Sequence, residues 1–173
     1  NEIVGNLLQN NQFEAMYLQA SHSNLIEGNL AEDNEVGLVM EKSRSNLVAR
    51  NDIQGNEKGI SLTSQESSIA VSTKGKGVFI SYNATPSGAI TPSNNTIYLN
   101  NLSNEANAYD DGRNRWDDGL IGNNYSDFND PEEGCRGSTI CATSYSIPGG
   151  PSIDAHPQAP PIREPGLASG RGG

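Results

Sequence analysis

Acidic side chains are concentrated in one stretch of the sequence, between residues 104 and 133. That stretch carries nine carboxylates against only Arg113 and Arg115. Carboxylate oxygens are the ligands that calcium prefers, although a solvated acidic face would explain the same residues. No motif fixes the spacing of the ligands. The calcium ligands that we expect from this stretch are Asp117, Asp118, Asp127 and Asp130.

The two cysteines of the chain, Cys135 and Cys141, lie in a Gly-rich segment. Two thiols without a nearby His make a poor metal site. We therefore predict a disulfide rather than two free thiols, and this bond indicates an oxidising compartment.

Two pairs of neighbouring acids, Asp110/Asp111 and Asp117/Asp118, are the remaining candidates for acid–base chemistry. Hydrolysis of a glycosidic bond needs two carboxylates that face each other across a groove. Neighbours in a strand point to opposite faces, so neither pair forms such a dyad by itself. We expect turn and capping roles for these residues, and no catalytic residues.

Carbohydrate contacts are a further option for this stretch. Tyr109, Trp116 and Tyr125 could stack on sugars if their rings were exposed in a row. The alternative is that Trp116 is buried and covers the end of the fold. Sequons mark candidate sites of N-glycosylation at Asn83, Asn94, Asn101 and Asn124, a number close to that expected by chance in a chain so rich in Asn.

The composition narrows the partners and the compartment. The formal charge of −10 disfavours nucleic acid and anionic lipid. No apolar run approaches the length of a membrane span, so we expect no membrane insertion. No signal peptide precedes Asn1, and the chain opens inside a repeat, so we interpret it as a processed or truncated product. We expect an extracellular or cell-surface protein.

An internal repeat of about 22 residues positions these groups. The segment 24–45 matches 46–67 at three Asn corners, and residues 1–23 fit with one extra residue. Residues 68–83 resemble a shortened copy, residues 83–93 a loop between coils, and a fifth start follows at Asn95. Apolar residues alternate with a period of two, as in Leu38/Met40 and Ile60/Leu62, which indicates short strands.

Stacking the copies buries a continuous apolar core and aligns equivalent Asn residues about 4.8 Å apart. Their amides can hydrogen-bond along such a ladder, and Asn tolerates the left-handed backbone that each corner needs. An antiparallel meander would not require matching residues at this period. We predict an all-β, right-handed parallel β-helix, with coils over 1–104, an irregular cap over 105–157 that holds the Cys135–Cys141 loop, and a Pro/Gly-rich flexible tail over 158–173.

The cap carries two motifs that resemble a known family. The run 114–119 (NRWDDG) with 122–128 (GNNYSDF) is similar to the N-x-W-D-D-G…G-N-Y-W-S-D-Y signature, and 145–150 (YSIPGG) with Asp154 and Pro157 to Y-x-I-P-G-G…D-x-x-P. Both belong to NosD-type right-handed β-helix proteins, also called carbohydrate-binding and sugar-hydrolysis repeats, which are abundant in surface proteins of methanogenic archaea. The segment 135–141 replaces the family's Asp/Gly-rich link between the two motifs, so no calcium role is carried over to it.

The resemblance also raises copper handling and polysaccharide cleavage, which we rank below other functions. Copper prefers clustered His, Met or Cys, whereas His22, His156, Met16 and Met40 are dispersed. Lyases and hydrolases of this fold need a long groove. We therefore expect no resident cofactor other than calcium.

Our first hypothesis is an extracellular structural solenoid that self-assembles into a surface layer, sheath or fibre, because an uncapped first coil exposes strand edges. The alternative is a carbohydrate-binding module with a polysaccharide partner.

Overall fold

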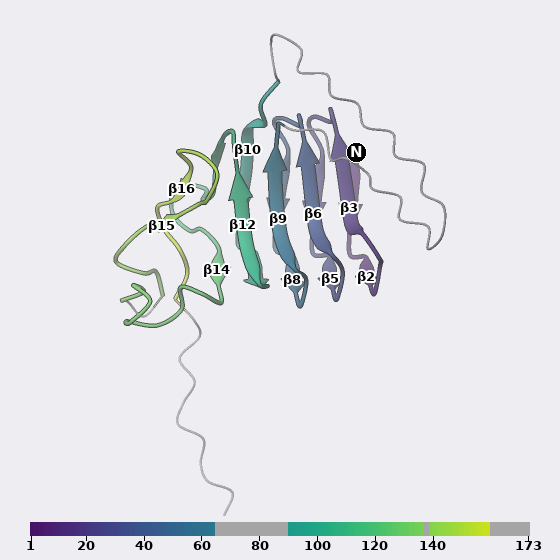
Figure 1. The fold of residues 1–173 in the computed structure, drawn as a ribbon. Coiled ribbons are helices and arrows are strands. Elements are labelled where there is room, and N and C mark those ends of the chain that lie inside the picture. The colour runs from purple at the N-terminus through teal and green to yellow at the C-terminus, as the bar shows by residue number, and fades with distance from the viewer. Residues whose placement is uncertain (65–89, 137–138, 160–173) are drawn as a thin grey trace, which may run out of the picture.

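The computed structural model describes residues 1–64, 90–136 and 139–159. These residues form a parallel β-solenoid with three walls, four complete coils and part of a fifth (Figure 1). The first wall contains β1 (Glu2–Val4), β4 (Leu25–Glu27), β7 (Leu47–Ala49), β10 (Ser93–Tyr98) and β13 (Arg113–Arg115). The second wall contains β2 (Leu7–Gln9), β5 (Leu30–Glu32), β8 (Asp52–Gln54), β11 (Asn101–Ser103) and β14 (Asn124–Tyr125). The third wall contains β3 (Glu14–Gln19), β6 (Val36–Glu41), β9 (Lys58–Thr63) and β12 (Ala106–Asp110). The predicted all-β solenoid is thereby confirmed.

Strand register follows the sequence repeat. Ile3, Ile26, Val48 and Ile97 stack as one inward column of the first wall. The other walls have matching columns, and the inward residues of coils two to four are almost all fully buried. The alternation read from the sequence is therefore the division between core and surface.

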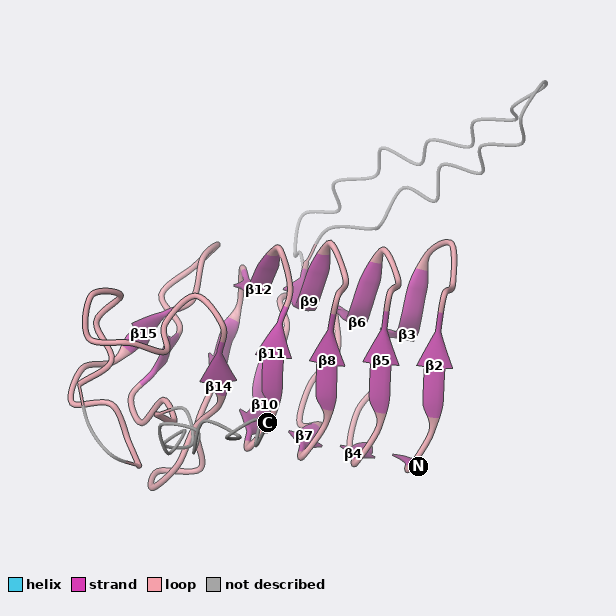
Figure 2. Ribbon diagram, turned by 90° about the horizontal axis from the view of Figure 1, so that it is seen from below, coloured by secondary structure: helices cyan, strands magenta, loops and turns pink. Residues whose placement is uncertain are grey.

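The fourth coil stacks directly on the third. Thr96 pairs with Leu47, Leu102 with Ile53, and Tyr109 with Ser61. The start at Asn95 therefore belongs to the coil next to residues 46–64, and not to a fifth coil as predicted. The shortened copy expected at 68–83, and most of the loop expected at 83–93, lie outside the described residues. The walls continue beyond residue 104 through β12, β13 and β14 (Figure 2).

The corners use their residues differently from the expectation. A left-handed backbone occurs at the residue before most ladder Asn residues, as at Arg50 (φ 56) before Asn51 and Leu99 (φ 57) before Asn100. The ladder Asn residues themselves do not have positive φ. Asn is therefore required at the corner for its amide, and the turn falls on its neighbour.

Beyond β14 the chain forms irregular loops and a small antiparallel sheet of β15 (Tyr145–Ser146) and β16 (Ile153–Asp154). A disulfide joins Cys135 to Cys141, as predicted. No helix long and apolar enough to cross a membrane occurs in the part of the chain that the structure describes.

Candidate functional site

Three Asn ladders run along the corners, and each has a direction. At the centre of one ladder, Asn51 Oδ1 accepts hydrogen bonds from the backbone N–H of Asn29 (3.0 Å) and from Asn29 Nδ2 (2.9 Å). Asn51 Nδ2 in turn donates to Asn100 Oδ1 at 2.9 Å. The Asn amide of every coil therefore donates hydrogen bonds to the next coil toward the C-terminus and accepts them from the coil before it. At the last coil the donors need acceptors, and at the first coil the Asn oxygens are the acceptors.

Side-chain oxygens close the C-terminal end of all three ladders. Asn123 donates its backbone N–H (2.7 Å) and its Nδ2 (3.2 Å) to Asp154 Oδ2. Asn107 Nδ2 donates to Asp127 Oδ1 at 2.7 Å, and the backbone N–H of Asn114 donates to Ser152 Oγ at 3.2 Å. Ionised carboxylates only accept hydrogen bonds, so they match ladder ends that only donate. This end of the solenoid is chemically capped.

Buried aromatic rings fill the capped end and are held by two buried acids. Trp116 Nε1 donates to Asp110 Oδ2 at 3.0 Å. Tyr125 donates its hydroxyl to Asp154 Oδ2 at 3.1 Å, and Tyr145 stacks on the Tyr125 ring with centroids 4.0 Å apart. Neighbouring acids point to different sides, because Asp110 faces inward while Asp111 accepts from Ser64.

The glycan-stacking surface predicted from Tyr109, Trp116 and Tyr125 is not formed. Trp116 and Tyr125 are fully buried, whereas Tyr109 is 39% exposed. Sugars stack on exposed ring faces, and two of these rings have none. The burial of Trp116 is what the capping interpretation requires.

Burial controls the electrostatics of the cap. Loss of solvent raises the pKa of Asp154 to about 6, although hydrogen bonds from Asn123, His156 and Tyr125 oppose this shift. The pKa of Tyr125 is raised well above its usual value, first by burial and then by the Asp154 charge. Burial, together with Asp127, also raises the pKa of Tyr145.

The four predicted calcium ligands are used separately. Asp118 accepts from the backbone N–H groups of Leu120 and Ile121, and these bonds lower its pKa. Asp117 accepts from Gly119 and Ala155. Asp130 closes a turn by accepting from Glu132 and Glu133, and Asp127 accepts from Asn107 and Tyr145. Among the described residues, no three or more His, Cys, Asp or Glu side chains gather as a metal site, so the geometry does not support the calcium prediction.

Soft metal donors are equally scattered, and every His, Met and Cys of the chain lies within the described residues. Met16 and Met40 are buried in the core, and both thiols are in the disulfide. His22 is exposed at a corner. His156 Nδ1 lies 3.6 Å from Asp117 Oδ2 and has no hydrogen-bond partner among the described residues. This donor set does not fit a copper ion.

Three of the four sequons lie on described residues. Asn94 and Asn101 are exposed and Asn124 is half-buried. Asn101 Nδ2 donates to Asp52, and Asn124 Nδ2 to the carbonyl of Gln158. Asn83 lies outside the described residues, as does the tail from residue 160.

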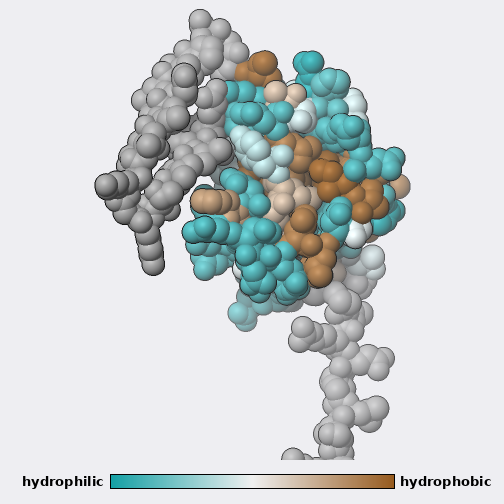
Figure 3. Space-filling model, turned by 90° about the vertical axis from the view of Figure 1, so that its right-hand side faces the viewer, coloured by the Kyte–Doolittle hydropathy of each residue, from teal (hydrophilic) through white to brown (hydrophobic). Residues whose placement is uncertain are grey.

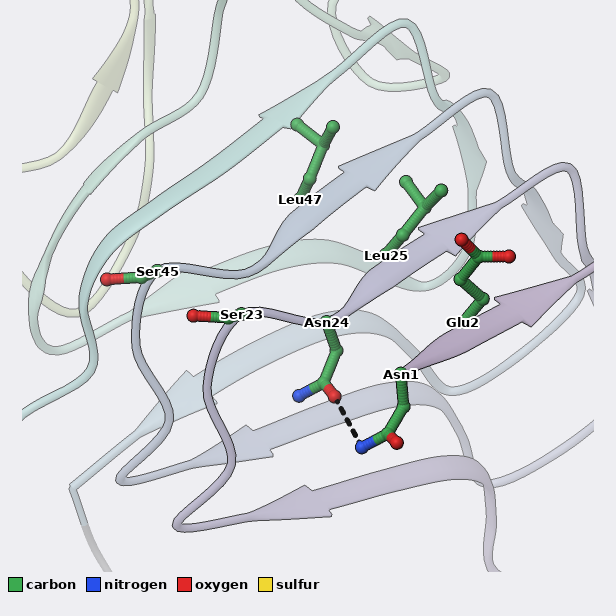
Figure 4. A pocket seen from close by; sticks show the side chains of 7 residues that line it. All are labelled: Asn1, Glu2, Ser23, Asn24, Leu25, Ser45 and Leu47. Atoms are coloured by element: carbon green, nitrogen blue, oxygen red, sulfur yellow. Dashed lines mark hydrogen bonds between the residues drawn. The ribbon is translucent and has the colours of Figure 1, made fainter.

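Among the described residues, nothing covers the outer face of the first coil in the way that the final loops cover the last coil. Asn1 and Asn6 donate to the next coil, but their Oδ1 atoms, like that of Asn11, accept no hydrogen bond from any described residue. Figure 3 looks onto this end and shows apolar surface inside a hydrophilic rim. A shallow pocket starts at this edge, where Glu2, Leu25 and Leu47 follow each other up the outside of the first wall (Figure 4). The sequence alone pointed to the edge of the first coil. It did not identify Asp110 and Asp154 as buried acceptors at the capped end, because nothing local in the sequence marks a carboxylate as buried.

A family model described as "Periplasmic copper-binding protein (NosD)" matches residues 1–130. No curated protein and no solved structure matches the chain. By its description, the matched family works in the periplasm, outside the cytoplasm. Because the match covers most of the sequence, the chain belongs to the NosD family.

Proposed function

We propose that this member of the NosD family is a structural β-solenoid that works outside the cytoplasm and self-assembles through the outer strand edge of its first described coil. Its assemblies would form a layer, sheath or fibre at the cell surface. The observation that carries the proposal is the contrast between the two ends. One end is closed by Asp154, Asp127 and Ser152, whereas at the other end no described residue donates to the Oδ1 atoms of the Asn ladders.

The first coil has the features of a strand edge that pairs with another chain. In later coils the residue after each ladder Asn donates its backbone N–H to the preceding coil, as Leu25 does to Asn1 and Leu30 does to Asn6. The equivalent N–H groups of Glu2 and Leu7 have no coil before them among the described residues. Such unpaired edges favour addition of another β-strand.

Exposed apolar side chains support contact at the same place. Val4 is 49% exposed, Leu7 62% and Phe13 43%, and all three lie in the first coil. Burying them on association would remove apolar area from water, and burial of such area drives association. Because the opposite end is capped, this contact joins two copies by their first coils. It uses the backbone edges of the strands and the apolar side chains, because the ladder Oδ1 atoms of both copies only accept hydrogen bonds. A layer, sheath or fibre then needs a second contact between such pairs.

Neither copper handling nor catalysis is part of the proposal. The family's description names copper, but the His, Met and Cys residues of this chain are dispersed, buried or oxidised. The carboxylates of the cap are used as hydrogen-bond acceptors for the ladders and aromatic rings. A carbohydrate-binding role is less well supported, because Trp116 and Tyr125 are buried.

The test is the association state of a first-coil variant. Leu7→Lys places a charge on the open edge, a change that blocks edge pairing. Leu47→Lys is the matched control, since Leu47 is also an outward, 37% exposed residue but lies on the third coil. At high salt, where contacts between exposed charges are screened, we expect native material to form pairs in sedimentation velocity and negative-stain microscopy, Leu7→Lys to lose them, and Leu47→Lys to keep them. A native chain that stays monomeric at all concentrations would overturn the proposal.

A further inference from the structure

One corner of the solenoid carries a row of basic residues. His22, Arg44, Ser93 and Arg113 occupy equivalent positions in successive coils, joined by parallel bridges between the third and first walls. His22, Arg44 and Arg113 are exposed. Neither arginine forms an ion pair with a described residue, although the chain carries a net charge of −10. Unpaired cations in line on an acidic protein are available to an outside partner.

A row of acids lies at the other edge of the third wall. Glu35, Glu57 and Glu105 each follow a ladder Asn at the corner between the second and third walls. Backbone hydrogen bonds between coils stack these residues. Lys58, which follows Glu57, donates its N–H to the carbonyl of Glu35, and Ala106, which follows Glu105, donates its N–H to the carbonyl of Glu57. All three side chains are exposed, and none forms an ion pair with a described residue. Lys58 is the one neighbouring cation in this row.

The two rows have the same spacing and matching order. Both climb one coil at a time, about 4.8 Å per step, because both are built on the same stacked strands. In coils one to four, the acidic edge has Phe13, Glu35, Glu57 and Glu105, and the basic edge has His22, Arg44, Ser93 and Arg113. When a second copy stands beside the first in the same orientation, each arginine faces an acid. Arg44 then faces Glu35, and Arg113 faces Glu105.

We propose that the basic row of one copy binds the acidic row of a second copy, side by side and in coil register. This inference rests on the proposed self-assembly, but it uses a different surface from the first coil. The contact is heterologous, because each copy in a pair keeps one unused row. Contacts of that type repeat without closing when the copies are related by translation, so they extend into a flat row of copies. This is the second contact that pairs of first coils need.

Charge density favours this partner over a free polyanion. The arginines of the row are two coils apart, roughly 10 Å, whereas a nucleic acid strand carries a charge about every 3.4 Å. Most charges of such a polymer would face an acidic surface unpaired. The acidic row of a second copy has the same pitch as the basic row, so both arginines can meet an acid.

The test reverses each row and then recombines the variants. In Arg44→Glu/Arg113→Glu both edges are acidic, and in Glu35→Arg/Glu105→Arg both edges are basic. All chains also carry Leu7→Lys, so that lateral association is measured without the first-coil contact. At low salt we expect lateral association to weaken on the order of tenfold in each double variant alone, because attractive exposed pairs become repulsive. Mixing the two variants should restore it, with alternating copies.

Arg50→Glu/Arg136→Glu is the control for total charge, because both residues are exposed and lie outside the two rows. It should associate like the parent chain. Unchanged layers in Arg44→Glu/Arg113→Glu, or no rescue on mixing, would overturn the lateral contact while leaving the first-coil proposal intact. Binding of polygalacturonate to the parent chain without association between copies would assign the basic row to a polysaccharide and would also overturn it. Loss of pairs in the Leu7→Lys single variant at high salt, where the lateral ion pairs are screened, tests the other contact separately.

Discussion

Replacing Asn51 by Ala tests whether the ladders hold the solenoid together. Asn51 is buried at the middle coil, and its amide takes part in five hydrogen bonds. Two are accepted from Asn29, and the others are donated to the carbonyls of Ile26 and Ala49 and to Asn100 Oδ1. Alanine cannot replace any of them, and the partners stay buried.

The expected loss follows from these bonds. A typical intramolecular hydrogen bond contributes about 0.5–1.5 kcal/mol net, and a buried group left without a partner costs about 1–3 kcal/mol. Asn29 Nδ2 keeps its hydrogen bond to the Ile3 carbonyl, and Asn100 Oδ1 still accepts from the backbone N–H of Asn51. Some partners of the Asn51 amide therefore keep one hydrogen bond in the variant. We expect Asn51→Ala to lower the free energy of unfolding by about 3–5 kcal/mol.

The matched control is Asn6→Ala in the same ladder at the open first coil. Asn6 is exposed, and its amide donates only to Asn29 and to the Val4 carbonyl. Water can replace these bonds, so we expect a loss of about 1 kcal/mol or less. Both values come from urea unfolding followed by far-UV circular dichroism. Equal losses for the two variants would refute the view that buried ladder amides, rather than corner geometry, stabilise the coils.

Two further predictions concern the cap. Burial raises the pKa of Asp154 to about 6 in the folded chain, so the folded state takes up this proton between about pH 6 and 4 while the unfolded state does not. The contribution of Asp154 to the free energy of unfolding should therefore rise as pH falls through that window, by up to about 3 kcal/mol. Urea titrations at pH 4.5 and 7 measure this rise, and Asp154→Asn should remove it. The same difference in stability between the two pH values in the variant and the native chain would contradict the prediction. Trp116→Phe removes the donor to Asp110 and should cost about 1.5–3 kcal/mol, seen as a lower thermal midpoint; no change would show that this bond does not stabilise the cap.

The repeat itself was predictable because its physics is local and periodic. Alternating apolar residues such as Leu38 and Met40 identify strands, and Asn at fixed spacing identifies the ladder that stacks them. The same reasoning placed the left-handed turn on the wrong residue, because the chain turns at Arg50 and not at Asn51. It also counted the coil that starts at Asn95 as the fifth, whereas its strands pair with those of the third coil.

Site prediction was weaker because it depended on burial. Trp116 and Tyr125 were candidates both for sugar stacking and for capping, and the two roles differ only in exposure. Asp117, Asp118, Asp127 and Asp130 are close in sequence, yet their oxygens bond to different backbone and side-chain groups. Convergence of ligands on one point is a property of loop conformation, which no short motif in this stretch fixes.

By itself, the sequence determined the solenoid, its three Asn corners, the disulfide and the resemblance to NosD-type proteins, because each depends on residue types at short or repeated separations. Only the tertiary structure decided which acids are buried acceptors, which end of the ladders is closed, and that Arg44 and Glu35 stand at opposite edges of one wall. These depend on contacts between residues far apart in the chain. They are set by the way the last loops fold back over the final coil and by the stacking of coils that repeats each corner residue along the axis.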